Sequence, residues 1–476
     1  MGLFGGCKVM EWSREEILLA TGGKMVCEGE KAVFSEVVTD SRRVGKGSVF
    51  IALKGERLDG HAFLRDAVRQ GAGCLVVHRR PALSILRDAT VIKVPDTLEA
   101  LGDLAHYRCQ MVAPKVLAIT GSNGKTTTKE MVAAILERAS IEGRSLRGKV
   151  LKTEGNYNNL VGLPLTLLRL RGREKAAVLE LGTSRPGEIK RLTQIASPAI
   201  GLITSVAPAH LAGLKNVAGV AREKGELFRG LNPGGIAVVN LDDPWVRRLG
   251  EKFKGEKITY GKSGEVGGES CQALGVKGME FTLRVGRERR RVRLRLSGKH
   301  NLSNAVGAAA MAYGLGVDLE TMGRGLEAVR PFPMRMEMDQ WRGIGIINDA
   351  YNANPASMQA ALKTLAEMGE GREKAAILGD MLELGGESRK RHLELGKQVA
   401  RCRIDRLYLI GERANQVKEG ALLAGMDDER VIIGKNHREI AGMVRTHARR
   451  GDWLLFKGSR GMNMEKVLAA FKEMGE

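Results

Sequence analysis

A run of small and polar residues at 121–128, GSNGKTTT, has the composition of a loop that holds phosphate groups. It follows the apolar segment KVLAIT, which predicts a strand, and precedes a segment with helical periodicity. In that arrangement backbone N–H groups surround the phosphates, the Lys125 ammonium reaches the terminal phosphates and the Thr126 hydroxyl is a ligand for Mg²⁺. The common pattern has a further glycine where this chain has Ile119, so a plain glycine turn before a helix is the structural alternative. We predict a nucleotide site formed by Gly121, Ser122, Asn123, Gly124, Lys125, Thr126 and Thr127.

Three other residues are candidates for chemistry because of where they stand in the pattern. Glu180 ends the apolar segment AAVLEL, and carboxylates at the carboxyl end of a parallel strand are well placed to hold Mg²⁺. His210 follows the apolar segment AIGLITS in a similar way, and Lys224 lies within the helical segment VAREKGELF. The structural alternatives are a surface carboxylate, a histidine that serves the fold and a solvated lysine.

The elements that must position these residues alternate between strand and helix. A small α/β unit is predicted for residues 1–110, with a helix opened by the capping box at Ser13. Residues 111–330 and 331–476 each repeat the strand–helix order, which predicts parallel sheets covered on both faces. Near the end of residues 111–330, the segments EFTLRV and RVRLRL predict a hairpin, and an asparagine-capped helix is expected from about Leu302. The fold class is therefore α/β, with three domains.

Length and composition agree with this division and limit the class of protein. The chain has 476 residues, which suggests about three domains, and 43% are hydrophobic, as in an ordered globular protein. The formal charge of +21 favours an acidic partner. Six scattered cysteines, without a C-x-x-C pair, indicate a reducing compartment. No targeting signal or apolar run of about 18 residues is visible, so we expect a cytoplasmic protein without integral membrane contact.

Seven arginines between Arg284 and Arg295 raise an alternative, a nucleic-acid-dependent P-loop ATPase. Aromatic residues make up only 4% of the chain, so few side chains are available to stack on bases. The order VRLRL places arginine at alternate positions, as on the solvent face of a hairpin. We therefore expect a solvated face and no nucleic-acid partner.

Ten segments in one order along the chain resemble the Mur ligase family of bacterial cell-wall synthesis: TDSRRVGKGSVFIALKGERLDGH, AITGSNGKTTTKE, TEGNYNNLVGLPLTLL, LELG, AHLAGL with REKGELF, GKHNLSNAVGAAA, MRMEM, INDAYNANPASM, LGDMLELGGES and KGSRGMNME. The resemblance implies an N-terminal UDP-sugar-binding domain, a central ATP-binding P-loop domain and a C-terminal Rossmann-like domain. It implies an ATP-dependent ligase that adds D-alanyl-D-alanine to UDP-N-acetylmuramoyl-tripeptide through an acyl phosphate. The third residue of the tripeptide, lysine or diaminopimelate, is not readable from the sequence.

The resemblance also implies roles for individual residues. Thr126, Glu180 and His210 would be metal ligands, and Lys125, His210, Lys224 and Arg335 would act at the reacting groups. Lys224 would be carbamylated, which turns a cation into an anion that can orient Mg²⁺. The adenine and ribose side of ATP would be held by Asn301, Asn304 and Asp349, with His300 nearby. Helix capping is the structural alternative for Asn301.

Two groups of residues resemble those that bind the other substrates. The UDP-sugar end would meet Ser41, Arg42, Lys54, Asp59 and His61, although a β-turn alone would explain the DGH sequence. The muramoyl peptide and the dipeptide would meet Thr153, Asn156, Asn158, Asn159, Tyr351, Asn352, Asn354 and Ser357. Asparagine-rich loops are often only turns.

Some positions differ from the family pattern, namely Thr183, Ser184 and Ala212. The alternatives left open are another Mur or folylpolyglutamate-type ligase, the nucleic-acid-dependent ATPase and a binding module without catalysis. The segment NANP in place of D-N-P-R favours the dipeptide-adding ligase, and the TDSRR segment disfavours a folylpolyglutamate-type enzyme. We expect a monomer.

Overall fold

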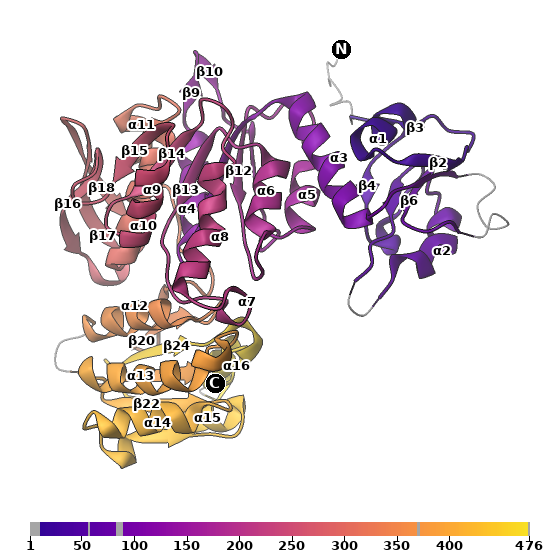
Figure 1. Cartoon of the computed structure of the whole chain (residues 1–476). Helices are drawn as coiled ribbons and strands as arrows, with labels where there is room; N and C mark the ends of the chain where they lie inside the picture. Colours follow the sequence, from indigo (N-terminus) through magenta and orange to yellow (C-terminus); the bar gives the residue numbers. More distant parts are fainter. Residues whose placement is uncertain (1–9, 56–57, 82–88, 369–371, 475–476) are drawn as a thin grey trace, which may run out of the picture.

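The computed structural model describes residues 10–55, 58–81, 89–368 and 372–474 and contains three α/β units, each with its own sheet (Figure 1). The central unit lies between the other two, and the C-terminal unit lies beyond one end of it. Cys7 falls outside the described residues, and the five described cysteines are free. Within the described residues, no helix combines the length and the apolar character needed to cross a membrane.

The N-terminal unit is a five-stranded sheet with three helices. Its strand order is β2-β7-β6-β5-β4, and only the β2–β7 pair is antiparallel. The strands are β2 (Lys24–Cys27), β4 (Val37–Val38), β5 (Val49–Ile51), β6 (Cys74–Val77) and β7 (Thr90–Lys93). A separate pair is formed by β1 (Trp12–Ser13) and β3 (Val33–Phe34), and the helices are α1 (Arg14–Thr21), α2 (Leu64–Arg69) and α3 (Thr97–Val112). The predicted capping box at Ser13 is confirmed, with Glu16 as its partner.

The central unit is built on a nine-stranded sheet. Its order is β11-β12-β8-β13-β14-β15-β16-β17-β18, with parallel pairs up to β16 and antiparallel pairs after it, so the predicted hairpin extends the parallel sheet. The strands are β8 (Lys115–Thr120), β11 (Val150–Lys152), β12 (Ala176–Glu180), β13 (Ile200–Ile203), β14 (Ile236–Asn240), β15 (Glu256–Tyr260), β16 (Val266–Ala273), β17 (Met279–Val285) and β18 (Glu288–Leu294). A short hairpin, β9 (Ser140–Ile141) and β10 (Arg144–Ser145), stands apart.

Helices cover both faces of the central sheet, because successive residues of β8 enter two different cores. Val116 and Ala118 pack with α6 (Glu188–Ala196), α8 (Val217–Arg229) and α9 (Pro244–Lys252). Leu117 and Ile119 pack with α4 (Lys125–Leu136), α10 (Lys299–Tyr313) and α11 (Leu319–Glu327). Two short helices, α5 (Gly162–Leu167) and α7 (Leu211–Leu214), complete the unit. A parallel sheet covered on both faces leaves its strand ends as the place for a ligand.

One boundary differs from the prediction. The helix expected from about Leu302 begins at Lys299, and Gly298 is its N-cap. Asn301 therefore lies inside the first turn, where its side-chain amide donates to the Ser297 carbonyl at 2.8 Å. The capping alternative for Asn301 is wrong, since the sequence signal for this helix start is a glycine without a side-chain cap.

The C-terminal unit is a six-stranded sheet of order β19-β20-β24-β21-β22-β23. Its strands are β19 (Glu337–Trp341), β20 (Ile344–Asp349), β21 (Lys374–Gly379), β22 (Arg406–Ile410), β23 (Val431–Ile433) and β24 (Trp453–Lys457). The helices are α12 (Pro355–Ala366), α13 (Ser388–Arg401), α14 (Ala414–Leu423), α15 (His437–His447) and α16 (Glu465–Glu473). The antiparallel edge strand β19 was not predicted, and the other five strands form the expected parallel sheet.

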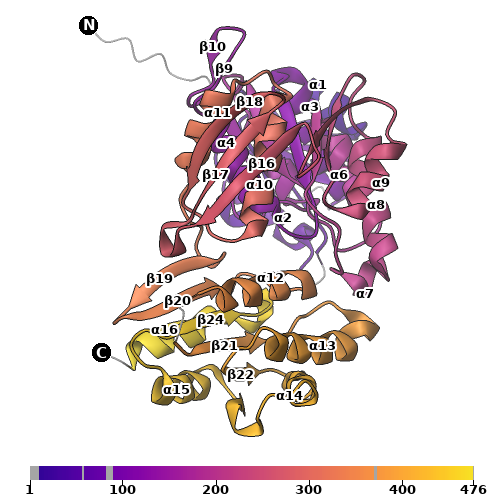
Figure 2. The ribbon, with the colours of Figure 1, turned by 90° about the vertical axis from the view of Figure 1, so that its left-hand side faces the viewer.

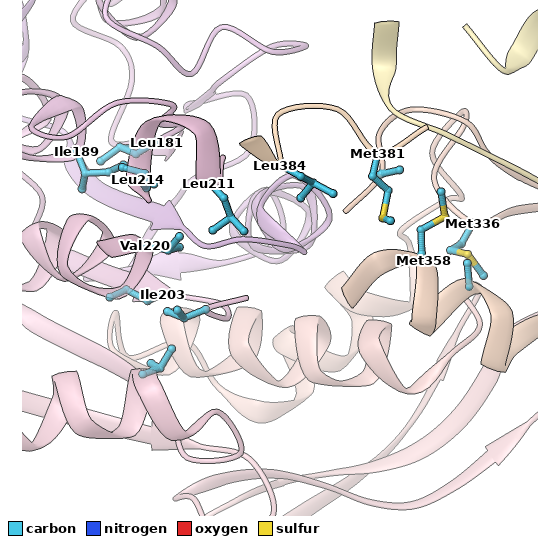
Figure 3. Close-up of a cluster of buried hydrophobic side chains, with 14 of the residues drawn as sticks. Leu181, Ile189, Ile203, Leu211, Leu214, Val220, Met336, Met358, Met381 and Leu384 are labelled. Atoms are coloured by element: carbon cyan, nitrogen blue, oxygen red, sulfur yellow. The ribbon is translucent and has the colours of Figure 1, made fainter. Parts of the chain in front are cut away.

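The central and C-terminal units share one core. α12 lies on the side of the C-terminal unit that faces the central unit (Figure 2). A cluster of buried side chains continues from Leu211 and Leu214 of α7 to Leu384, Met381 and Met358 of the C-terminal unit (Figure 3). Apolar burial on both sides stabilises this junction, so residues from two units can face the same cavity.

Candidate functional site

A cavity of about 630 Å³ lies where the strand ends of the central sheet meet the C-terminal unit. Both units contribute to its wall, and most of the predicted site residues are there: Ser122, Asn123, Gly124, Lys125, Thr126, Thr127, Asn158, Asn159, Glu180, His210, Asn301, Asn304, Arg335, Asp349, Tyr351, Asn352, Asn354 and Ser357. Other predicted residues are not in its wall, namely Gly121, Thr153, Asn156, Lys224 and the five N-terminal residues.

The P-loop backbone is shaped by two glycines. Gly124 is the N-cap of α4 with a φ of 81°, and a Cβ atom there would lie 2.2 Å from Oδ1 of Asn304. A Cβ atom on Gly121 would lie 1.8 Å from Oγ1 of Thr204. These close approaches require glycine, and they bring the loop against both a neighbouring strand end and α10. Lys125 donates from Nζ to the Gly121 carbonyl at 2.8 Å.

Oxygen ligands suitable for Mg²⁺ lie at the end of β12. The Thr126 hydroxyl donates to Oε2 of Glu180 at 2.8 Å, and the Asn158 amide donates to Oε1 of the same carboxylate at 2.8 Å. No group of three His, Cys, Asp or Glu side chains that would hold a metal by themselves is found among the described residues. Magnesium is usually held by one or two carboxylates together with substrate phosphates and water, so this hydroxyl and carboxylate pair fits it.

Lys224 is buried in α8, with only 1% of its surface exposed, so the alternative of a solvated lysine is wrong. Burial, helped by the nearby Lys125 cation, holds the pKa of Lys224 well below its ordinary value. The adjacent Glu223 accepts from the Gly187 and Ile189 amides. No hydrogen bond or ion pair of the Lys224 ammonium is present within residues 10–55, 58–81, 89–368 and 372–474. Burial likewise lowers the pKa of Lys125.

His210 links the two units. It has a left-handed backbone with a φ of 52° and precedes α7. Its Nδ1 lies 2.6 Å from Oε2 of Glu383, in the loop after β21. The hydrogen bond to His210 lowers the pKa of the Glu383 carboxyl. Glu383 belongs to LGDMLELGGES, one of the segments that resemble the Mur ligase family, but the sequence analysis predicted no role for this residue.

The C-terminal unit presents Arg335 on a tightly turned segment. Met334 and Met336, on either side of it, have φ values of 58° and 50°, a region that side-chain-bearing residues rarely adopt. The Arg335 guanidinium lies 3.7 Å from the ring centre of Tyr351, which is a cation–π contact. The backbone and the ring together fix an arginine in the cavity wall.

Lys457 is a site residue that the sequence reasoning missed. It ends β24, is almost fully buried and lines the cavity. Its Nζ pairs with Oδ2 of Asp349 at 2.5 Å and donates to the Asn352 carbonyl at 2.9 Å. The other Asp349 oxygen accepts from the Met336 amide. The sequence did contain a signal for Lys457, because this residue follows the apolar segment WLLF at the carboxyl end of a parallel strand.

Buried asparagines border the P-loop from α10. The Asn304 amide donates to Oδ1 of Asn301 at 3.2 Å, and both residues line the cavity. His300 lines it as well, and burial lowers the pKa of its imidazole. Both asparagines therefore lie beside the P-loop, and their contact with a nucleotide base stays a prediction.

A second cavity of about 560 Å³ lies between the N-terminal and central units. Its wall includes Asp40 and Arg43 from the TDSRR segment, and Glu154 and Tyr157 from the loop at 153–159. That loop therefore lines both cavities, since Asn158 and Asn159 face the first. Buried Thr153 supports the loop, because its hydroxyl accepts from the Glu180 amide at 3.0 Å.

The structure does not bring the other N-terminal residues into either cavity. Ser41 and Arg42 lie next to the second cavity, where Arg42 forms an ion pair with Asp40 at 2.7 Å. Asp59 is the N-cap of a short 3-10 helix, Gly60–Phe63, and its carboxylate lies 2.8 Å from Nδ1 of His61. His61 also accepts from the His78 amide, so both ring nitrogens are engaged within the fold. Lys54 forms a β-bridge with Asp59. Contacts of these residues to a UDP-sugar stay a prediction.

Comparisons with known proteins agree with this geometry. Three family descriptions match the chain: "Mur ligase family, catalytic domain" at residues 33–108, "Mur ligase middle domain" at 119–312 and "Mur ligase, glutamate ligase domain" at 334–460. A UDP-N-acetylmuramoyl-tripeptide–D-alanyl-D-alanine ligase of Escherichia coli is 37% identical over 94% of this chain and 96% of its own.

Solved structures are similar over nearly the whole chain. A crystal structure of MurF from Acinetobacter baumannii has a TM-score of 0.89 at 33% identity, with 98% of this chain and 99% of that chain covered. MurF from Thermotoga maritima, solved in complex with ADP, has a TM-score of 0.81 at 28% identity, with 92% and 97% covered. With its P-loop, its cavity between two units and these relatives, the chain belongs to the Mur ligase family.

Proposed function

We propose that this protein is the ATP-dependent ligase that adds D-alanyl-D-alanine to UDP-N-acetylmuramoyl-tripeptide. The observation that carries the proposal is the cavity that joins the P-loop to the segment 351–357 of the C-terminal unit. Nucleotide-binding groups and the segment that resembles the dipeptide site thus face one another. Relatives that bear this activity in their names match over more than nine-tenths of the chain.

The arrangement of cations suits a reaction between two anions. ATP with Mg²⁺ supplies the phosphoryl group that activates the substrate carboxylate as an acyl phosphate. Lys125 from the P-loop and Arg335 from the C-terminal unit line the same cavity and neutralise charge from two sides. Thr126 and Glu180 would hold the metal, and His210 is the remaining candidate ligand.

The two cavities suggest how the long UDP-linked substrate lies. Its nucleotide-sugar end would occupy the cavity between the N-terminal and central units, beside Asp40, Arg43 and Tyr157. Its peptide would follow the loop at 153–159 toward Asn158 and Asn159 in the first cavity. The terminal carboxylate would then meet Lys125, while the dipeptide amine approaches from the side of Tyr351.

Lys224 would carry a carbamate. Its depressed pKa raises the neutral fraction of the amine, and a neutral amine is the form that adds to CO₂. The addition forms an N–C bond and releases a proton, and the carbamate anion would replace the repulsion between Lys224 and Lys125 with an attraction. The carbamate would orient Mg²⁺ together with Thr126 and Glu180, and carbamylation is tested separately below.

The arginine-rich hairpin does not require a nucleic-acid partner. Arg284 and Arg289 pair with Glu269, and Arg290 pairs with Glu320 and Glu327. Arg291 pairs with Glu280. Much of the positive charge on this hairpin is therefore matched locally, which supports a solvated face. We also propose that the protein works as a monomer in the cytoplasm.

Phosphate release from ATP tests the proposed function. We expect release to require both UDP-N-acetylmuramoyl-tripeptide and D-alanyl-D-alanine, with each omitted in turn as a control. Single-stranded DNA is added in parallel, and release that depends on DNA and ignores the dipeptide would contradict the proposal. Parallel assays with lysine and diaminopimelate tripeptides identify the third residue from the higher kcat/KM.

A further inference from the structure

Beyond the proposed function, and resting on it, we propose that Glu383 of the C-terminal unit is a positioning residue for His210. The carboxylate holds the imidazole so that its other nitrogen is free to act as a ligand in the cavity. The central unit supplies the histidine and the C-terminal unit supplies the group that orients it. The site is therefore completed only when the two units are in contact.

The hydrogen bond fixes which ring nitrogen carries the proton. Nδ1 of His210 lies 2.6 Å from Oε2 of Glu383, and a carboxylate only accepts. Nδ1 is thus the donor, and in neutral imidazole Nε2 is then the acceptor. Nε2 has no partner among the residues that the structure describes, and the ring lines the cavity that contains Glu180. Histidines that bind metals commonly donate their other nitrogen to a carboxylate in this way.

Glu383 is held against α7 by more than its side chain. The Ala212 amide donates to the Glu383 carbonyl at 3.1 Å. Leu384, only 2% exposed, belongs to the same buried cluster as Leu211 and lies between it and Met381 in Figure 3. A Cβ atom on Gly385 would stand 3.3 Å from Cα of Ala212, so the loop passes close to the helix. Main-chain, apolar and charged contacts therefore all hold the loop that carries Glu383 against α7.

The loop is anchored just as firmly on its own unit. The Met381 amide donates to Nε2 of His392 at 3.0 Å, and the Leu382 amide donates to the Ser459 hydroxyl at 2.8 Å. Glu383 itself has a φ of 63°, an uncommon conformation that these bonds help to maintain. Glu383 is thus fixed to the C-terminal unit and bonded to a histidine of the central unit. The orientation of the His210 ring therefore depends on whether the two units are in contact.

The test compares Glu383→Gln and Glu383→Ala with a control, Glu387→Gln. Glu387 is four residues away in the same segment and pairs with Arg391 at 3.2 Å. Mn²⁺ is titrated into the full-length protein with saturating ADP, and bound metal is followed by electron paramagnetic resonance. We expect the Glu383 variants to bind Mn²⁺ about 10- to 100-fold more weakly, the range typical for removing such a carboxylate, and the control to match wild type.

A second measurement reports the histidine directly. With ¹⁵N-labelled histidine, and His210→Gln to assign the signal, the wild-type ring should show the Nδ1–H tautomer and Glu383→Ala should lose that preference. Unchanged Mn²⁺ affinity and tautomer in the variants would overturn the proposal. Tighter Mn²⁺ binding would also overturn it, because the ion pair would then be a latch that competes with the metal. If the proposed ligase function is wrong, this is seen in a different assay, because the wild-type protein then shows no dipeptide-dependent phosphate release.

Discussion

Asn123 of the P-loop and Asn354 at the start of α12 exchange two amide hydrogen bonds. The Asn354 amide donates to Oδ1 of Asn123 at 2.8 Å, and the Asn123 amide donates to Oδ1 of Asn354 at 3.4 Å. Asn354 is also the N-cap of α12, where its Oδ1 accepts from the Ser357 amide. The phosphate loop and the helix that borders the proposed dipeptide site are thus joined directly, although the residues come from different units.

Breaking this pair should weaken the coupling between the two sites. Asn354→Ser keeps a good N-cap but loses the amide bridge, and Asn123→Ala removes it from the other side. We expect each change to raise the KM for ATP several-fold, because each removes about 1 kcal/mol of stabilisation. In the double variant, the loss of free energy should be smaller than the sum of the two single losses. Steady-state kinetics measures this. Strictly additive effects would mean that the two asparagines act independently.

Lys125 and Glu180 should be indispensable to turnover rather than to folding. Lys125→Met removes a cation from the place where charge develops, and we expect kcat to fall at least about 100-fold. Glu180→Gln keeps the bond from the Thr126 hydroxyl but loses the negative charge, so the Mg²⁺ requirement should rise. Phosphate release over a range of Mg²⁺ concentrations measures both. A Lys125→Met variant with near-wild-type kcat would remove Lys125 from the mechanism.

The strands that precede Lys125 and contain Glu180 could be predicted from the sequence because their apolar patterns are local. A largely apolar strand that is followed by a glycine-containing loop and a helix, as in β8 and α4, can be recognised from the local sequence alone. The start of α10 at Gly298 was missed because no side chain marks it. The edge strand β19 was missed because most of its residues are polar, and because its pairing with β20 depends on the turn at Arg342 and Gly343, both of which have positive φ.

Contacts between residues far apart in the chain could not be predicted from the sequence for a different reason. Lys457 meets Asp349, and Glu383 meets His210, across more than a hundred residues of chain. A single sequence shows that each of these residues follows a strand, but not which strand ends become neighbours. The strand order brings Lys457 to Asp349, because β24 lies between β20 and β21. The packing of the two units brings Glu383 to His210.

Carbamylation of Lys224 should be visible without an activity assay. Native mass spectrometry of the protein in bicarbonate buffer should show an added CO₂ that is absent in Lys224→Ala, because the buried amine has a lowered pKa. Lys224→Ala should also lose nearly all activity. Lys215→Ala changes a lysine just before α8 and serves as the control. If Lys224→Ala works at the wild-type rate, or if no carbamate forms on the wild type, the hypothesis fails.

Two ion pairs of the C-terminal unit should differ in their effect on stability. Lys457 is 1% and Asp349 14% exposed at the side chain, whereas Lys472 and Asp339 are 34% and 56% exposed. Lys457→Met leaves a buried carboxylate without its partner and should cost about 3 to 5 kcal/mol of unfolding free energy. Lys472→Met should cost less than about 1 kcal/mol. Urea unfolding of the two variants makes the comparison, and equal losses would show that burial does not set the difference.

The stability of the protein should fall as the pH decreases below about 6.5, partly because of His392. Its imidazole is fully buried, accepts from the Met381 amide, and has a lowered pKa because burial disfavours the cation. The unfolded chain takes up a proton near the ordinary histidine pKa, while the folded protein does so only at lower pH. Protonation therefore favours unfolding across that interval, and the loss levels off below the folded pKa.

Thermal unfolding of wild type and His392→Gln between pH 5 and 8 isolates this contribution. The variant should be less stable at pH 8, since it loses the imidazole bond to the Met381 amide, but its midpoint should decline less steeply toward pH 5. His61 and His300 also have lowered pKa values and retain part of the slope in the variant. Equal slopes for the two proteins would mean that His392 is protonated equally in the folded and unfolded states. In that case the bond from Met381 would not hold the ring neutral, and the anchor of the loop that carries Glu383 would be weaker than the structure indicates.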